Sequence, residues 1–184
     1  MNWRASRVGG CLEARIERRS DGALLLRSSE ALGTHPSSIT ERLEHWAHVV
    51  PDRTFVARRN PAVAGGGDWL RISYAQMRDR ARRIGQALLA RGLSVERPLA
   101  ILSDNDLEHL SLAMGALWAG IPYVPVSPAY SLVAQDYDKL RHILGRVTPG
   151  LVFASGPAYA KAIAAVVGTE AEGVLTEGFV EGRP

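Results

Sequence analysis

The stretch PLAILSDNDLEHLSLAMGALWAGIPYVPV, residues 98–126, decides the fold class, because two kinds of apolar pattern alternate along it. It opens with a continuous apolar run at Pro98–Leu102, which is typical of a strand buried on both faces. Apolar residues at helical spacing come next: Leu107, Leu110, Met114, Leu117 and Trp118. Gly120 is placed to end that helix, and Ile121–Val126 is expected to form a second strand. A strand, a helix and a strand in this order predict a parallel βαβ unit with a right-handed crossover.

The same alternation continues toward the C-terminus. Helical spacing predicts helices at Asp138–Val147 and Tyr159–Val167, and continuous apolar residues predict a strand at Leu151–Ala154 between them. Gly173–Thr176 is a candidate for one more strand. Residues 98–167 are therefore expected to form an α/β core, in which the first strand and Leu151–Ala154 share one parallel sheet.

Three prolines follow the helix at every third position, at Pro122, Pro125 and Pro128. Proline fixes φ at about −65° and has no N–H to donate. The strand at Ile121–Val126 is therefore expected to be short, and the chain is expected to leave the sheet as an irregular loop. We assign this segment a scaffolding role rather than a chemical one.

The residues before the core predict short antiparallel strands. Charged and apolar residues alternate over residues 13–27, and the Asp21-Gly22 pair in their middle is typical of a hairpin turn. Two further strands are expected at Thr54–Arg58 and Trp69–Ile72, joined by a flexible loop with three consecutive glycines.

Two amphipathic helices also precede the core. The first has a capping box at Ser38 and Glu41 and stops at Pro51, and the second has a capping box at Ser73 and ends at Gly92. The apolar stripe of the first helix comprises Ile39, Leu43, Trp46, Ala47 and Val50. The buried stripe of the second comprises Met77, Ala81, Ile84 and Leu88. Each cap is worth ~1 kcal/mol, because it satisfies main-chain N–H groups that have no partner within the helix.

These patterns together predict an α/β fold: an incomplete parallel sheet with βαβ units, preceded by a hairpin, short antiparallel strands and two amphipathic helices. Residues 1–12 are expected to be a disordered N-terminus, and residues 13–167 the folded domain. Residues 168–184 are expected to be a frayed tail, because acidic residues and glycines occur there without an apolar period.

Composition excludes several classes of protein. The chain has 184 residues, of which 46% are hydrophobic and 22% charged, which is enough apolar material for one core. A net charge of +3 gives no strong field for nucleic acid, and no run approaches the ~20 apolar residues of a membrane span. The single cysteine, Cys11, can form neither an internal disulfide nor a metal set. We therefore expect a cytoplasmic protein that binds neither nucleic acid nor membrane.

Several groups of residues could carry chemistry, but each has a simpler structural interpretation. Ser103–Asp106 follows a strand where ligands bind in parallel sheets, although Ser103 or Asp104 is better explained as a helix cap. SGPAYAK, residues 155–161, resembles a nucleotide loop, but it has one glycine and a proline suited to a helix start. NPAVAGGGD, residues 60–68, lies between two strands and lacks the lysine of a phosphate loop.

Two further groups are side chains on the predicted helices. His45 and His48 could share a helix face, but two histidines without a third ligand make a weak metal site. The arginines of the second helix indicate either a solvated face, which we favour, or a basic binding patch that lacks interleaved aromatic residues; they are Arg78, Arg80, Arg82 and Arg83. We assign no catalytic, cofactor-binding or metal-binding residue.

Three stretches in a fixed order resemble the N-terminal part of the AMP-forming acyl-CoA synthetases, in the adenylate-forming superfamily. These stretches are Glu41–Ala57, Ile72–Ser131 and Lys139–Ala154. They contain the helix start Ser73-Tyr74-Ala75-Gln76 and the turn from Ala119-Gly120 through Pro125 and Pro128, which that superfamily shares. SPAYSL (residues 127–132) and DGALLLRSSEALG (residues 21–33) look more specifically like feruloyl-CoA synthetases. The resemblance covers about residues 13–167.

The resemblance implies a reaction for a full-length enzyme. Family members activate a carboxylic acid, aromatic or fatty, with ATP and Mg²⁺, release pyrophosphate and transfer the acyl group to CoA. They use a phosphate loop that ends in lysine, an aromatic-rich motif, an acidic ribose contact and a C-terminal lysine, none of which this sequence contains. We therefore expect an N-terminal fragment of an acyl-CoA ligase, truncated before the phosphate loop and inactive alone. ATP, Mg²⁺, CoA and the acid would be ligands of the full-length enzyme.

The alternative is a stand-alone α/β module that binds a small ligand or a partner chain without catalysis. The unpatterned residues near the C-terminus favour truncation. An unfinished sheet would leave a strand edge and an apolar helix face open, so the isolated chain is expected to aggregate. The acyl substrate is not identified, because the family builds its acyl pocket mainly from later residues.

Overall fold

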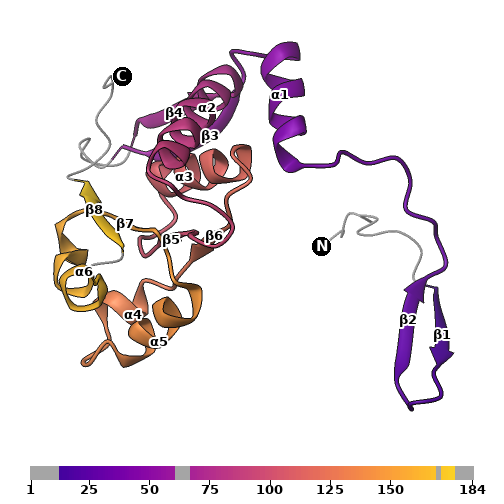
Figure 1. Ribbon diagram of the computed structural model, residues 1–184. Coiled ribbons are helices and arrows are strands. Elements are labelled where there is room, and N and C mark those ends of the chain that lie inside the picture. Colours follow the sequence, from indigo (N-terminus) through magenta and orange to yellow (C-terminus); the bar gives the residue numbers. More distant parts are fainter. Residues whose placement is uncertain (1–12, 61–66, 169–170, 177–184) are drawn as a thin grey trace, which may run out of the picture. The chain divides into compact units, whose positions relative to one another are not determined.

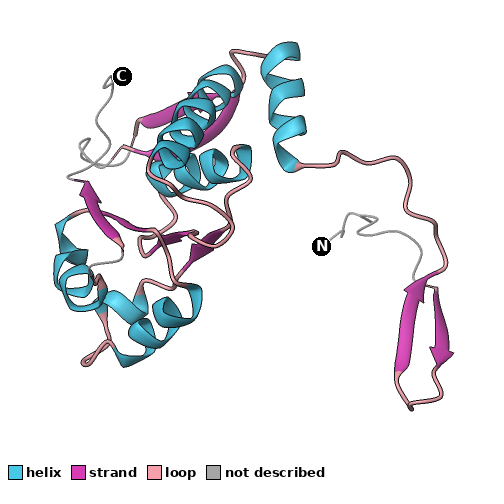
Figure 2. Ribbon diagram, viewed as in Figure 1, coloured by secondary structure: helices cyan, strands magenta, loops and turns pink. Residues whose placement is uncertain are grey.

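The structure is a computed structural model that describes residues 13–60, 67–168 and 171–176, and the structural statements below refer to these residues. The chain divides into two units, residues 1–37 and residues 38–184, each of which is described by itself. Figure 1 labels the helices and strands, and Figure 2 separates them by type. No helix in the described ranges is both long enough and apolar enough to cross a membrane.

The first unit is the predicted hairpin. Strands β1 (Ala14–Arg18) and β2 (Leu24–Ser28) pair antiparallel around Gly22, whose φ of 85° is readily adopted only by glycine. Ile16 lies directly opposite Leu26. Because side chains alternate between the faces of a strand, these two and Leu24 share one face, and each is more than half exposed.

The second unit begins with two helices and a second hairpin. Helix α1 (Ile39–Val49) is followed by strands β3 (Thr54–Arg59) and β4 (Trp69–Ser73), which pair antiparallel, and by helix α2 (Tyr74–Ala90). Ser38 and Ser73 both act as the N-caps that the sequence predicts. Ser38 Oγ accepts a hydrogen bond from the Glu41 N–H at 3.3 Å, and Ser73 forms the full reciprocal capping box with Gln76.

A parallel sheet of four strands forms the centre of this unit, as Figure 1 shows. Its strands are β5 (Leu99–Ile101), β6 (Tyr123–Pro125), β7 (Leu151–Ser155) and β8 (Glu172–Thr176), in the spatial order β6-β5-β7-β8. The helices among them are α3 (Leu107–Trp118), α4 (Ala129–Leu132), α5 (Asp138–Val147) and α6 (Ala160–Val166), with the 3₁₀ turn η1 (Pro157–Tyr159). The prediction that the strands at 98–102 and 151–154 share a sheet is confirmed, because β5 and β7 are neighbours.

The two faces of the sheet are covered by different helices. Leu99, Ile101 and Phe153 pack with residues of α2 and α3, whereas Ala100 and Val152 pack with residues of α5 and α6. All five side chains are buried. Alternating side chains that are buried on both faces explain why these strands have continuous apolar sequences.

The prolines act on β6 as predicted, but the segment after it is partly helical. The strand ends at Pro125, and Val126 donates one further main-chain hydrogen bond to Ile101 at 2.8 Å. The expected irregular loop contains the short helix α4, which Pro128 precedes with φ −53° and ψ −28°. The third proline therefore starts a helical turn, because its fixed φ suits a helix N-terminus.

Trp46 belongs to the predicted apolar stripe of the first helix, but it is not buried in the core. Helix α1 packs through Leu43 and Ala47, which are 2% and 3% exposed, whereas Trp46 is 36% exposed. The guanidinium of Arg42 lies 5.8 Å from the centre of the indole ring and covers part of it. Helical spacing identifies the correct side of the helix, but only its central positions reach the core.

The predicted terminal segments are only partly described. Residues 1–12, which we expected to be disordered, lie outside the described residues. The strand expected at Gly173–Thr176 is confirmed as β8, which pairs with β7. The boundary of the folded domain at residue 167 stays a prediction.

Candidate functional site

The carboxyl edge of the parallel sheet is the natural place for a ligand. From β5 the chain continues to β6, which lies at one edge of the sheet. From β7, the neighbour of β5 on its other side, the chain continues to β8 at the opposite edge. Open α/β sheets bind ligands outside the carboxyl ends of the strands at such a reversal. The segment after β5 contains Ser103–Asp106, and Gly156 follows β7.

Side-chain hydrogen bonds tie these two segments together. Asp106 is the N-cap of α3, and its Oδ1 accepts the His109 N–H at 2.7 Å. Its other carboxylate oxygen accepts a hydrogen bond from the hydroxyl of Ser155 at the end of β7. The Tyr159 hydroxyl donates to Asp104 Oδ2 at 3.2 Å. The position where the strand order reverses is therefore closed by polar contacts within the protein.

The identity of the helix cap corrects the sequence-based interpretation. We expected Ser103 or Asp104 to cap α3, but Asp106 does so with an extended backbone, φ −120° and ψ −177°. Asp104 instead binds Tyr159, which lies 55 residues later. Ser103 is 2% exposed, and its hydroxyl has no hydrogen-bond partner among the described residues.

Tyr159 is held as a hydrogen-bond donor. Burial raises the pKa of its phenol above 10, and the negative charge of Asp104 raises this pKa further. Only 4% of the residue is exposed. Tyr159 is therefore protonated at neutral pH and can donate to Asp104.

His109 faces main-chain carbonyl groups. Its Nδ1 lies 3.2 Å from the carbonyl oxygens of both Ser103 and Asp104. Because carbonyl oxygens only accept hydrogen bonds, Nδ1 carries a proton. Within the described ranges no serine hydroxyl bonds to this ring, so the site contains no Ser–His nucleophile pair.

A cavity of about 280 Å³ lies beside the ends of β5 and β6. It is lined by residues 125–128 and by Ser103, Asp104, Asn105 and His109. Hydroxyl, amide and imidazole groups can hydrogen-bond a small polar ligand here. Asp104 and Asp106 add negative charge at this edge, which repels a polyphosphate that arrives without a cation.

The other residues considered from the sequence do not join this site. Metal ligands cluster nowhere in the described ranges in groups of three or more, and the His45 ring stacks edge-on against Trp46 at 4.8 Å. Pro157 begins η1 after Gly156, which has φ 94°, so SGPAYAK forms the helix start that its proline predicts. The glycine-rich loop falls largely outside the described residues.

Comparison with known proteins gives one family match. The family model described as "AMP-binding enzyme" matches residues 43–180. Phenyloxazoline synthase MbtB of Mycobacterium tuberculosis is 37% identical over 98 residues, which are 53% of this chain and 6% of that protein. Bacitracin synthase 1 of Bacillus licheniformis is 32% identical over 119 residues, which are 61% of this chain and 2% of that protein.

Solved structures give the same fold. The fatty acid AMP ligase from Legionella pneumophila is similar with a TM-score of 0.61 and 19% identity, over 75% of this chain and 23% of that one. The chain therefore spans a small part of the curated relatives and about a quarter of this structure.

Proposed function

The chain belongs to the AMP-binding enzyme family, and from this membership we propose that it forms the N-terminal part of the catalytic domain of an adenylate-forming ligase. The main support for this proposal is the length of chain that the family model matches. Residues 43–180 run from within α1 to beyond β8 and so include the whole described parallel sheet.

The proposed reaction has two steps. A carboxylate oxygen attacks the α-phosphorus of ATP, the bond to pyrophosphate breaks, and an acyl-adenylate forms. A thiol then attacks the acyl carbon and AMP leaves. Charge develops on the phosphates in the first step, so catalysis needs hydrogen-bond donors and a metal ion aimed at them.

We assign this chain a scaffolding part in that reaction. The carboxylates that the carboxyl edge presents, Asp104 and Asp106, already accept hydrogen bonds from Ser155 and Tyr159, and their charge repels phosphate groups that no cation accompanies. The Ser155–Asp106 hydrogen bond joins the segments that follow β5 and β7 at this edge of the sheet. The groups that contact ATP are proposed to come from polypeptide outside this chain.

We further propose an acid–CoA ligase that acts on an aromatic acid of the ferulate type. The segments at residues 21–33 and 127–132 support this subclass by their resemblance to feruloyl-CoA synthetases. A second candidate is the adenylation domain of a peptide synthetase. It is favoured by the 37% identity to phenyloxazoline synthase and the 32% identity to bacitracin synthase 1.

ATP–pyrophosphate exchange tests the proposal. The assay compares the purified chain with the native polypeptide, captured from its source with an antibody against this chain. Ferulate, a fatty acid and a set of amino acids are the substrates. We expect exchange and a CoA thioester from the native polypeptide with ferulate, and background exchange from the chain alone.

Three other results would change the assignment. Exchange with an amino acid and no CoA thioester would establish the peptide-synthetase candidate instead. A native polypeptide no longer than this chain and without exchange would establish a non-catalytic module. Turnover by the chain alone that Asp104→Asn abolishes would place a catalytic site at the carboxyl edge and refute the scaffolding role.

A further inference from the structure

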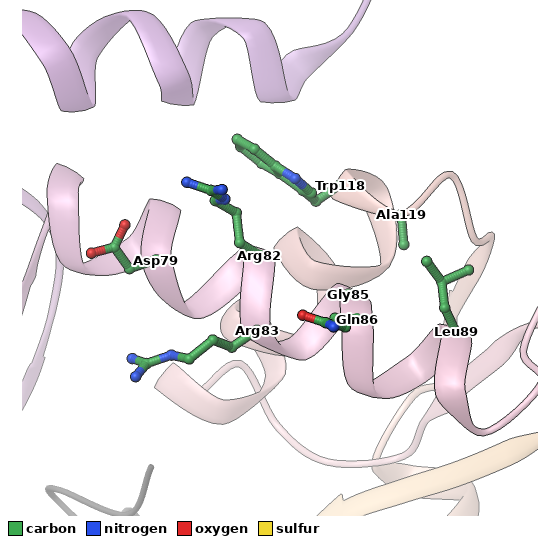
Figure 3. Close-up of a pocket in the computed structure, with 8 residues that line it drawn as sticks. All are labelled: Asp79, Arg82, Arg83, Gly85, Gln86, Leu89, Trp118 and Ala119. Carbon is green, nitrogen blue, oxygen red and sulfur yellow. The ribbon is translucent and has the colours of Figure 1, made fainter.

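Helices α2 and α3 form a groove of about 580 Å³ beside their crossing, shown in Figure 3. Gly85, which has no side chain, and Ala119, which has only a methyl group, are among the residues that line it. Leu89, which is 54% exposed, and Trp118, which is half-buried, are its larger apolar residues. The groove therefore offers apolar surface to a ligand outside the hydrophobic core.

The rim of the groove carries uncompensated positive charge. Arg82 and Arg83 are exposed, and neither guanidinium bonds to a residue that the structure describes. The one acidic residue that lines the groove, Asp79, is already paired: its Oδ1 accepts from Nε and Nη2 of Arg78 at 2.9 and 2.8 Å. A ligand with carboxylates therefore finds two available cations.

The structure supplies the aromatic residue that the sequence of α2 lacks. From the sequence we favoured a solvated face, because no aromatic residue is interleaved with these arginines. Trp118 comes from α3, and Figure 3 shows its indole ring and Arg82 extending to the same side of the helices. Tryptophan and arginine together are the residues most enriched where proteins bind other proteins.

We propose that this groove binds an acidic amphipathic peptide segment of a partner protein. Carboxylates of the segment pair with Arg82 and Arg83, and its apolar side chains cover Leu89 and Trp118. Small-molecule sites enclose most of their ligand, whereas the arginines and Leu89 here stand in solvent. A peptide laid along the helices matches that exposure, and this proposal holds whether or not the chain takes part in adenylation.

Fluorescence anisotropy tests the proposal. The probe is a fluorescein-labelled peptide, EELFEELLEELF, and the comparison peptide has glutamine at each glutamate. The test variant is Arg82→Glu/Arg83→Glu. Its matched control, Arg71→Glu/Arg146→Glu, makes the same charge change at two exposed arginines elsewhere in the second unit. We expect roughly tenfold weaker binding by the test variant and none of that loss in the control.

Further measurements separate binding in this groove from unfolding of a variant and from non-specific attraction between charges. Trp118→Ala should also weaken the acidic peptide, while circular dichroism shows whether each variant stays folded. Raising salt should weaken binding, because the arginines are exposed. Equal binding by the test variant, equal binding of the glutamine peptide, or no binding at all would overturn the proposal. Tighter binding of a single-stranded oligonucleotide than of the peptide would also overturn it, because the surface would then prefer phosphate.

Discussion

Gly85 and Gly115 face each other where α2 crosses α3, and neither position has room for a side chain. A Cβ atom on Gly115 would lie 2.3 Å from Cγ2 of Ile84, and one on Gly85 would lie 2.9 Å from the Gly115 carbonyl oxygen. Both distances are shorter than real carbon contacts. The two glycines therefore set how closely the helices approach.

Gly115→Ala should lower the free energy of unfolding by about 1–3 kcal/mol, because overpacking outweighs the gain of ~1 kcal/mol in helix propensity. Gly145→Ala is the matched control, since this glycine also lies within a helix and a Cβ atom there meets nothing within 4 Å. We expect the control to gain up to about 1 kcal/mol. Urea denaturation measures both, and a Gly115 variant as stable as the control would contradict the close crossing.

The Ser155–Asp106 hydrogen bond should appear as a coupling energy between the two residues. Asp106→Ala removes a helix cap as well as this bond, whereas Ser155→Ala removes the bond alone. In a double-mutant cycle we expect an interaction of about 1–3 kcal/mol, because one partner is charged. Ser38→Ala combined with Ser155→Ala is the control. That pair shares no hydrogen bond, and its effects should add.

Ionisation of Glu108 should lower the free energy of unfolding as pH rises. Its side chain is 13% exposed, and burial raises its pKa above the ordinary 4.5, with the charge of Asp106 adding to the effect. The Arg58 guanidinium, at 4.0 Å, and Arg80 oppose this shift. A raised folded-state pKa gives stability that is full below 4.5 and is lost as pH rises through the folded value.

Glu108→Gln should therefore be more stable than the unchanged protein at pH 7, with the difference shrinking below pH 4.5. Glu96 provides the contrast, because its hydrogen bond from Ser94 lowers its pKa. Glu96→Gln should be the less stable protein at pH 7, and that deficit should vanish on acidification. Thermal melts from pH 3 to pH 8 would reveal both trends. The same sign for both variants would be inconsistent with these environments.

The apolar face of the first hairpin should promote self-association. Ile16 and Leu26 are each 68% exposed and lie directly opposite one another. Ile16→Thr/Leu26→Thr should lower light scattering at a given concentration, because threonine keeps strand propensity and removes apolar surface. Arg15→Thr/Arg27→Thr changes the facing pair on the other side of the hairpin and should give no such reduction.

The elements that the sequence predicts well are those with a long or unbroken apolar pattern. The unbroken run before Ser103 and the stripe ending at Trp118 predict β5 and α3, because burial on both faces of the sheet demands apolar residues throughout. Helix α4 escapes prediction because a single helical turn has no period to detect.

The site residues depend on contacts between distant segments. Four polar residues precede α3, and local spacing cannot tell which of them caps it. Asp106 differs from the other three because its carboxylate accepts a hydrogen bond from Ser155, which lies 49 residues later. The sequence likewise does not show that Trp118 and Arg82 line the same groove. Their proximity depends on the packing of α3 against α2 at Gly85 and Gly115.

Pro125 makes the outer edge of β6 less suitable than that of β8 for pairing with a further strand. Main-chain N–H groups alternate in direction along a strand, and the Val126 N–H bonds to β5, so the nitrogen of residue 125 faces away from the sheet. Proline has no hydrogen there, and the outer side of β6 keeps the Tyr123 N–H as its donor within the strand. A further strand would therefore form few main-chain hydrogen bonds with β6. Any strand that extends this sheet is expected to pair with β8, at the opposite edge.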